Sequence, residues 1–255
     1  MTDPLHTPHP ATAIIPARLG STRFPAKVLA DQTGRPLIQH VVEAASRASL
    51  IGKVVVATDD TAVRMAVEQF GGTAVMTRPD HPNGTSRLAE AAQILGLSGD
   101  DVIVNVQGDE PEIEGHVIDA AVRALYQTGA EVSTVASPFA PGEDPADPNI
   151  VKVVTGSNGY AMYFSRARIP HARAGGVPVP PMKHIGLYCY RARFLQQYAA
   201  MEPTPLERSE MLEQLRVLEH GHRIGVAVCA VHTAGIDTPE QYAAFVARWK
   251  ARPHA

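Results

Sequence analysis

The chain lacks the sequence features of several large protein classes. Its 255 residues include only two cysteines, Cys189 and Cys229. Two cysteines supply neither a disulfide framework nor a set of zinc ligands, so we expect two buried thiols in a reducing cytoplasm. No apolar run approaches the roughly 18 residues that span a membrane, and residues 1–10 lack the basic and apolar regions of a signal peptide. We therefore expect a cytoplasmic protein without membrane contact, with a disordered tail over residues 1–10.

Positive charge and two common nucleotide-binding motifs are also missing. The formal net charge is −3, which disfavours nucleic acid as a partner because such binding needs clustered cations. No Gly-x-Gly-x-x-Gly follows the first predicted strand, which argues against a dinucleotide dehydrogenase. The loop after that strand also lacks the Gly-x-x-x-x-Gly-Lys-Ser/Thr spacing of a P-loop. The length nevertheless suffices to bury a full core without disulfides or metals.

The first half of the chain alternates strand patterns with helix patterns. Short apolar runs predict strands, each covered on both faces, at residues 13–16, 53–57, 73–76 and 102–106. Helical patterns lie between them at residues 37–48, 60–70 and 85–95. Asp60 is well placed to cap the second helix. This βαβαβ order predicts an α/β fold with a mostly parallel, doubly wound sheet.

After residue 130 the alternation becomes less regular. Strands are predicted at residues 131–137, 150–154, 160–164, 184–190 and 224–230, with a turn at 156–159. A loop is predicted at 166–181, a closing helix at 238–249, and an amphipathic helix at 207–220 whose apolar positions are Met211, Leu212, Leu215 and Leu218. We see neither an internal repeat nor a low-complexity linker. We therefore predict a single domain over residues 11–250, with a small antiparallel insertion over residues 130–200.

The most informative segment is the loop that follows the first strand. Five polar residues stand in it, namely Arg18, Ser21, Thr22, Arg23 and Lys27. Open parallel sheets place ligands at the carboxyl ends of their strands. Cations and small hydroxyl groups delivered to that edge are suited to holding a triphosphate.

Two carboxylates follow later strands. Asp109 stands at the carboxyl end of the predicted strand 102–106, within the run Gln107-Gly-Asp-Glu-Pro, in which Gly108 allows another backbone to approach closely. Mg²⁺ prefers oxygen ligands and often takes only one or two protein carboxylates. The alternative for Asp109 is a helix cap before Pro111, which the motif favours less. Asp237 opens Asp-Thr-Pro-Glu, which is by itself an ordinary helix start. A second carboxylate that can meet Asp109 favours a shared metal site.

An ordered series of motifs runs over residues 12–245. It comprises IIPAR-x-x-STR-x-P-x-K, VATDD, MTR-x-DH, VNVQGDEP, VKVV, YFSRA-x-IP, H-x-G-x-Y, LE-x-x-EMLEQLRVLE and GIDTPE. In these motifs the chain resembles the 3-deoxy-manno-octulosonate (Kdo) cytidylyltransferases, also called CMP-Kdo synthetases. The resemblance implies a fold like that of nucleotide-diphospho-sugar transferases and a homodimer. It also implies transfer of CMP from CTP to the sugar acid Kdo, with Mg²⁺ as cofactor and release of pyrophosphate, for lipopolysaccharide biosynthesis.

The resemblance also assigns roles to individual residues. Catalytic roles fall to Arg18, Lys27, Asp109 and Asp237, of which the two aspartates hold Mg²⁺. CTP contacts fall to Arg18, Ser21, Arg23, Lys27, Met76, Arg78, Gly84 and Thr85. Kdo contacts fall to Gln107, Arg166, His184, Tyr188, Glu213 and Gln214, with Arg166 suited to pair with the Kdo carboxylate. Without the resemblance, Tyr188 would be expected in the core, His184 in a structural role, and Glu213 and Gln214 on a solvated helix face.

Two departures and two alternatives accompany this assignment. Ser86 stands where many members carry an acidic residue, and the segment 170–176 differs from the common pattern, so no role is given to His171. The chain could instead activate another sugar acid, such as a sialic, pseudaminic or 8-amino-Kdo acid. A non-catalytic nucleotide-binding protein is the second alternative, and the presence of all four expected catalytic residues argues against it. The cytosine base and the dimer rest on the resemblance alone.

Overall fold

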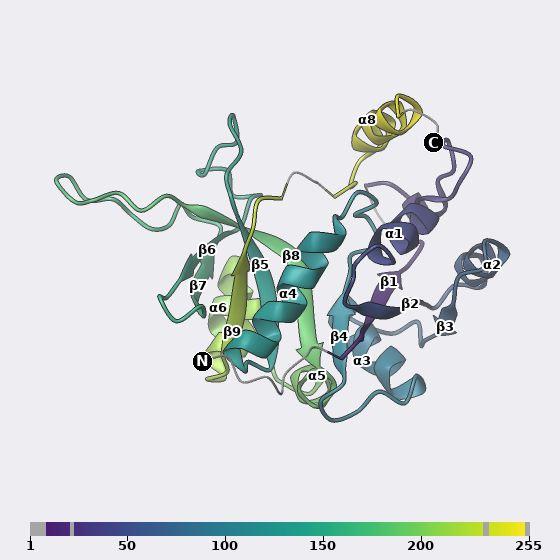
Figure 1. Ribbon diagram of the computed structural model, residues 1–255, viewed down its shortest axis with the longest axis horizontal. Coiled ribbons are helices and arrows are strands. Elements are labelled where there is room, and N and C mark those ends of the chain that lie inside the picture. Colours follow the sequence, from purple (N-terminus) through teal and green to yellow (C-terminus); the bar gives the residue numbers. More distant parts are fainter. Residues whose placement is uncertain (1–8, 21–22, 232–234, 253–255) are drawn as a thin grey trace.

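A computed structural model describes residues 9–20, 23–231 and 235–252. Within them the strands build a nine-stranded sheet in the order β3-β2-β1-β4-β8-β5-β9, and β6 and β7 form a hairpin beside β8 (Figure 1). The strands are β1 (Ala11–Ala17), β2 (Ile51–Thr58), β3 (Ala74–Met76), β4 (Val102–Asn105), β5 (Val132–Pro138), β6 (Lys152–Thr155), β7 (Ala161–Ser165), β8 (Met182–Arg191) and β9 (Ile224–Val228). The helices are η1 (Lys27–Leu29), α1 (Leu37–Ala45), α2 (Thr61–Gln69), α3 (Gly84–Ile94), α4 (Gly115–Thr128), α5 (Ala192–Ala199), α6 (Pro205–Glu210), α7 (Gln214–Glu219) and α8 (Pro239–Lys250).

The strand directions confirm the predicted fold class. Strands β1 to β4 are parallel to their neighbours within the first half of the sheet, and β5 is parallel to β9. Strand β8 runs antiparallel to both β4 and β5, and the β6–β7 hairpin adds the remaining antiparallel pairs. The sheet is therefore mostly parallel with a small antiparallel part, as the sequence predicted. The turn predicted at residues 156–159 joins β6 to β7.

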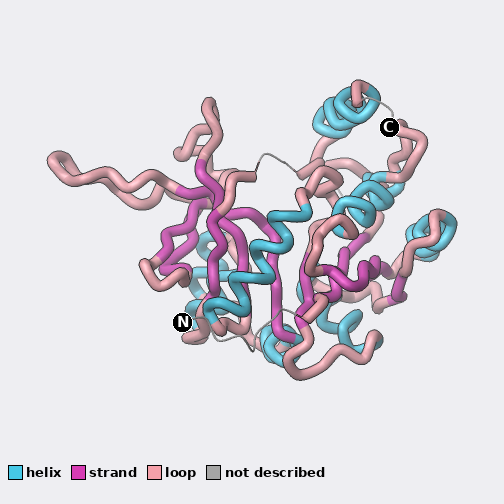
Figure 2. Tube along the Cα trace, in the orientation of Figure 1, coloured by secondary structure: helices cyan, strands magenta, loops and turns pink. Residues whose placement is uncertain are grey.

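Helices cover both faces of the sheet (Figure 2). Ile15 of β1 belongs to a buried cluster that includes Ile38 of α1 and Ile118 of α4. The adjacent Ile14 belongs to a second cluster that includes Leu88 of α3. Successive side chains of a strand point to opposite faces, so each strand with two covered faces needs a nearly continuous apolar run. This is why the first-half strands could be identified from the sequence.

Helix α8 packs against the first half of the chain through a third cluster. Leu37 at the start of α1 contacts a cluster that contains Ile236, Tyr242 and Phe245. Thr238 caps α8, with a reciprocal capping box to Gln241 and Pro239 in the first turn. The predicted helix start is thus correct, and it leaves Asp237 immediately before the cap.

One predicted helix is wrong in its extent. Residues 207–220 fall on two short helices, α6 and α7, because Met211 has a positive φ of 52°. A left-handed residue ends the hydrogen-bonded run of an α-helix. Met211 is 76% exposed, whereas Leu212 and Leu215 are buried as expected. Two further helices, α4 and α5, were not predicted.

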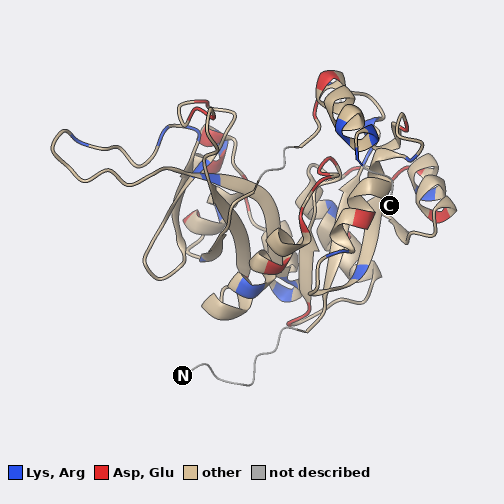
Figure 3. Cartoon of the chain, turned by 45° about the horizontal axis from the view of Figure 1, so that its top comes forward, with Lys and Arg blue, Asp and Glu red and all other residues tan. Residues whose placement is uncertain are grey.

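The loop between β7 and β8 extends far from the sheet (Figures 1 and 2). Val177 in this loop is 92% exposed. Acidic and basic residues are interspersed along the elements seen in Figure 3. Within the ranges given above, none of the helices combines the length and the apolar character that crossing a membrane requires.

Candidate active site

Two cavities adjoin at the carboxyl ends of β1 and β4. The first has a volume of about 390 Å³, and its lining includes seven of the predicted residues, Arg18, Arg23, Lys27, Gly84, Gln107, Asp109 and Asp237. The second has a volume of about 300 Å³, and its lining includes five more, Thr85, His184, Tyr188, Glu213 and Gln214. Gly84 and Gln107 line both cavities. The structure thus brings most of the predicted site residues to one edge of the sheet, in two adjoining groups.

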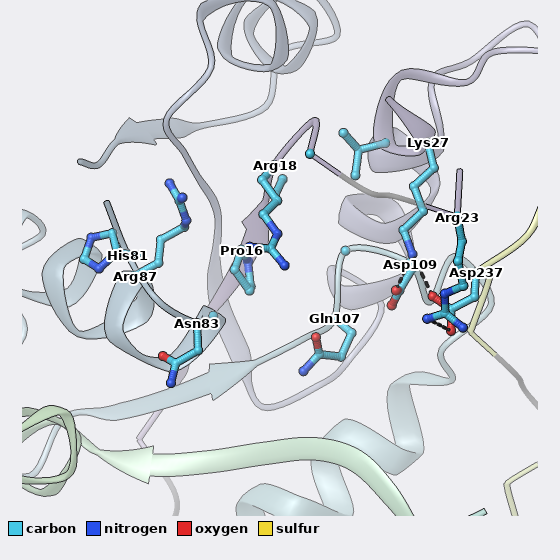
Figure 4. Close-up of a pocket in the computed structure, with 15 residues that line it drawn as sticks. Pro16, Arg18, Arg23, Lys27, His81, Asn83, Arg87, Gln107, Asp109 and Asp237 are labelled. Atoms are coloured by element: carbon cyan, nitrogen blue, oxygen red, sulfur yellow. Dashed lines mark hydrogen bonds and ion pairs between the residues drawn. The ribbon is translucent and has the colours of Figure 1, made fainter. Parts of the chain in front are cut away.

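A cluster of cations and carboxylates occupies one end of the first cavity (Figure 4). The Lys27 Nζ lies 2.6 Å from Asp109 Oδ2 and 3.1 Å from Asp237 Oδ1, and it also donates to the Ile236 carbonyl at 2.8 Å. Arg23 forms an ion pair with Asp237 at 3.1 Å. Lys27 is buried, with 9% of its surface exposed. Two aspartates separated by more than a hundred residues in sequence therefore meet at one ammonium group.

Backbone contacts hold this cluster in place. A Cβ added to Gly108 would lie 2.9 Å from the Pro16 carbonyl oxygen, so only glycine fits between the ends of β1 and β4 here. The Asp109 carbonyl accepts a hydrogen bond from the Ile236 amide at 2.8 Å. Ala26, directly before Lys27, has a φ of 53°, a conformation that is unfavourable for residues other than glycine. The close approach predicted for Gly108 is confirmed.

The donor set of this cluster is suited to Mg²⁺. Asp109 and Asp237 both contact the Lys27 ammonium, so their oxygens are close enough to share one cation. Their side chains are 29% and 40% exposed, which leaves room for substrate oxygens and water. In the part of the chain that the structure describes, no group of three or more His, Cys, Asp or Glu residues is arranged to hold a metal. Two carboxylates are nevertheless enough for Mg²⁺ when phosphates and water complete its shell.

Three polar residues that sequence reasoning missed line the opposite end of the first cavity (Figure 4). Arg87 is only 4% exposed, and its guanidinium contacts Thr77 Oγ1 at 2.6 Å and Asp59 at 3.2 Å. Asn83 caps α3 by accepting from the Ser86 amide at 2.9 Å. His81 contacts the Ser86 hydroxyl at 3.1 Å and also Glu90. A signal for Arg87 was available, because it lies three residues after Gly84 and therefore on the same helix face as a residue already assigned to the site.

Aromatic side chains form a wall of the second cavity. Tyr188 stacks on Tyr190 with ring centroids 5.9 Å apart, and Tyr190 stacks on Tyr198 at 6.4 Å. His184 lies beside Tyr188, and its Nε2 is 3.0 Å from the Thr134 hydroxyl. Burial lowers the pKa of His184 to about 3. The imidazole is therefore neutral at neutral pH and available for hydrogen bonding.

The break between α6 and α7 brings Glu213 and Gln214 to the second cavity. Glu213 accepts a hydrogen bond from the Thr85 hydroxyl at 3.2 Å, which joins α7 to the first turn of α3. Burial raises the pKa of Glu213, although this hydrogen bond acts in the opposite direction. Gln214 is buried, and its Nε2 has no hydrogen-bond partner within the described ranges. These two residues thus line a cavity rather than a solvated helix face.

Three predicted site residues do not line either cavity. Met76 is 40% exposed at the end of β3. Arg78 lies nearby, with its amide bonded to Glu90 at 2.9 Å. The Arg166 guanidinium donates to the carbonyls of Glu210, Pro148 and Met211 at 2.7, 3.0 and 3.3 Å. Ser21 and Thr22 lie outside the described residues, as do residues 1–8 of the predicted tail.

Comparisons with known proteins agree on one family. The profile of the cytidylyltransferase family matches residues 12–224. A 3-deoxy-manno-octulosonate cytidylyltransferase from Anaeromyxobacter sp. is 52% identical over 227 residues, which cover 89% of this chain and 91% of that protein. The same enzyme from Syntrophobacter fumaroxidans is 48% identical over 235 residues, 91% of this chain and 94% of the relative. The solved structure of a CMP:2-keto-3-deoxy-manno-octonic acid synthetase complexed with CTP is 38% identical, with a TM-score of 0.87, over 94% of this chain and 98% of that one.

Proposed function

The chain belongs to the 3-deoxy-manno-octulosonate cytidylyltransferase family, and on this premise we propose that it transfers CMP from CTP to Kdo and releases pyrophosphate. The observation that carries this proposal is the pair of adjoining cavities that share Gly84 and Gln107. CTP occupies the first cavity, with its phosphates toward Lys27 and Arg18. Kdo occupies the second, so that the two substrates meet at the shared wall.

The proposed reaction is an in-line displacement at the α-phosphorus of CTP. The anomeric hydroxyl group of Kdo attacks the phosphorus, a new oxygen–phosphorus bond forms, and the bond to the pyrophosphate breaks. Arg18 and Lys27 line the phosphate end and offset the negative charge that grows on the departing pyrophosphate. No covalent intermediate with the protein is required.

We assign the metal to Asp109 and Asp237. Mg²⁺ held there would neutralise phosphate charge and lower the pKa of the attacking hydroxyl group. Support comes from the donor chemistry of two carboxylates that face the same point, beside the residues proposed to hold the phosphates. Lys27 and Arg23 together supply two positive charges beside the two carboxylates.

Kdo is proposed to lie among Gln107, His184, Tyr188, Glu213 and Gln214. This polar and aromatic lining suits a polyhydroxylated acid, because hydroxyl groups both donate and accept hydrogen bonds. The described lining of the second cavity contains no Arg or Lys. Arg166 is tied to the carbonyls of the 210–211 segment at the rim, so its proposed pairing with the Kdo carboxylate requires it to leave those carbonyls.

The proposal is tested by measuring pyrophosphate release with CTP, UTP, GTP and ATP, each with and without Kdo and Mg²⁺. We expect release only when CTP, Kdo and Mg²⁺ are all present. Activity with UTP or GTP but not with CTP contradicts the assignment of the nucleotide. A panel of sialic, pseudaminic and 8-amino-Kdo acids then tests the acceptor, and a preference for one of them over Kdo contradicts the assignment of the sugar acid.

Three wider expectations accompany this function. We propose that the product serves lipopolysaccharide biosynthesis and that the enzyme acts in the cytoplasm, where CTP is available and its two free cysteines stay reduced.

We also propose a homodimer. Met162 of β7 is 66% exposed, which leaves an apolar side chain on the surface for a contact between subunits. Light scattering of the purified protein, with Met162→Lys as the disrupting variant, tests the dimer.

A further inference from the structure

Asn105 is a polar residue at a position where the fold would accept an apolar one. It is the last residue of β4, in register with Ile14 of β1 and Tyr188 of β8. Strand alternation puts Asn105 on the same face as Ile103, which is fully buried in the core cluster of that face. Asn105 itself is only 4% exposed. An apolar side chain would therefore have satisfied the packing.

The side-chain oxygen of Asn105 is left without a partner. Within the described ranges Oδ1 has no hydrogen-bond donor, although the residue lines the second cavity. A buried polar atom that lacks a partner weakens the folded state, and such atoms are rare in proteins. The same cavity contains Gln214 Nε2, which also has no partner in the described part of the chain. One unpartnered acceptor and one unpartnered donor thus line a single cavity.

We propose that Asn105 determines specificity for the sugar acid, with its Oδ1 accepting a hydrogen bond from one hydroxyl group of that substrate. The acceptor cannot pair with an ionised carboxylate, which has no proton to donate. Asn105 therefore faces the hydroxyl-bearing part of the substrate. Gln214 supplies a complementary donor to a hydroxyl oxygen. This inference rests on the proposed function, because it takes the second cavity as the site of Kdo.

The test compares Asn105→Leu and Asn105→Ala with the wild-type protein and with Ser133→Ala as a control. Ser133 is a buried polar residue of the same sheet, outside both cavities, and its hydroxyl is satisfied by the Ala121 carbonyl at 2.7 Å. We expect Asn105→Leu to raise the KM for Kdo about tenfold, because one hydrogen bond is lost. The KM for CTP should stay within about twofold, as should both values in the control. The melting temperature of Asn105→Leu without substrates should equal or exceed that of the wild type.

Kdo analogues that each lack one hydroxyl group complete the test. One analogue should raise the KM of the wild-type protein and have no further effect in Asn105→Leu, which identifies the hydroxyl group bound by Asn105. An unchanged KM for Kdo in both variants overturns the inference and indicates that a water molecule satisfies the amide. Equal rises in the KM for CTP and Kdo, or loss of folding in both variants, also overturn it, since either indicates a structural role. A wild-type protein without activity on CTP and Kdo contradicts the proposed function itself.

Discussion

Replacing Lys27 by Met tests the cation and carboxylate cluster directly. The substitution keeps most of the side-chain volume and removes the ammonium, which contacts Asp109 at 2.6 Å and Asp237 at 3.1 Å. Breaking a fully buried ion pair costs about 3–5 kcal/mol, whereas exposed pairs contribute about 1 kcal/mol or less. Lys27 is buried and the aspartates are partly exposed, so we expect a loss of roughly 2 kcal/mol, between those limits. For a chain of this size that corresponds to a melting temperature lowered by about 5 °C.

Mg²⁺ should then stabilise the variant more than the wild type. In the wild type the metal competes with the Lys27 ammonium for the same carboxylates, whereas in Lys27→Met it meets Asp109 without a counter-ion and Asp237 paired only with Arg23. Scanning calorimetry with and without Mg²⁺ measures both effects, and we also expect pyrophosphate release to fall by about a hundredfold or more. Lys183→Met is the matched control, since that ammonium is similarly buried and lies 2.6 Å from Glu143. Equal Mg²⁺-induced shifts in Lys27→Met and the wild type would refute a shared metal site.

Three further substitutions give separate tests. Asp109→Asn should abolish most pyrophosphate release and leave the circular dichroism spectrum unchanged, and near-normal turnover contradicts the metal assignment. Gly108→Ala should lower the free energy of unfolding by roughly 1–3 kcal/mol in urea titrations, because its Cβ would lie 2.9 Å from a backbone oxygen. Gly20→Ala is the control for this test. Its added Cβ has no neighbouring atom within 4 Å, so the free energy of unfolding should stay unchanged. Burial lowers the pKa of His40 to about 4, so stability should fall as the pH drops from 7 to 5, by about 2 kcal/mol. His40→Phe should remove this part of the pH dependence, and parallel profiles for the two proteins count against it.

The sign of the His40 effect follows from proton binding. In the unfolded chain an imidazole takes up a proton near its ordinary pKa of about 6.5. In the folded protein the ring is buried between Phe245 and Trp249 and stays neutral until about pH 4. Between these values the unfolded state binds more protons, so acidification favours unfolding. This contribution is complete above pH 6.5 and is lost as the pH falls toward 4.

The sequence was informative where local pattern and tertiary environment agree. Strands β1, β2 and β4 are covered on both faces and therefore carry apolar runs, which identified them directly. Asp109 and Asp237 could be proposed as a pair because each follows a strand at the ligand-binding edge. The contact of Lys27 with both aspartates was not predicted. The contact between Thr85 and Glu213 depends on how α3 and α7 pack together. No local pattern contains that information, so only the motif resemblance suggested that both residues belong to the site.

The failures of local reasoning are concentrated around the second cavity. A continuous helical pattern over residues 207–220 is broken at Met211, which adopts an unfavourable backbone conformation. The break lets Glu213 and Gln214 face the cavity, where Gln214 Nε2 has no hydrogen-bond partner among the residues that the structure describes. Asn105 is a polar residue in the otherwise apolar strand β4, and it lines the same cavity. Each departure weakens the isolated fold, and each adds a hydrogen-bonding group to one cavity wall. Local rules are expected to fail where a ligand supplies the missing interactions, so these failures support the proposal that the second cavity binds a substrate.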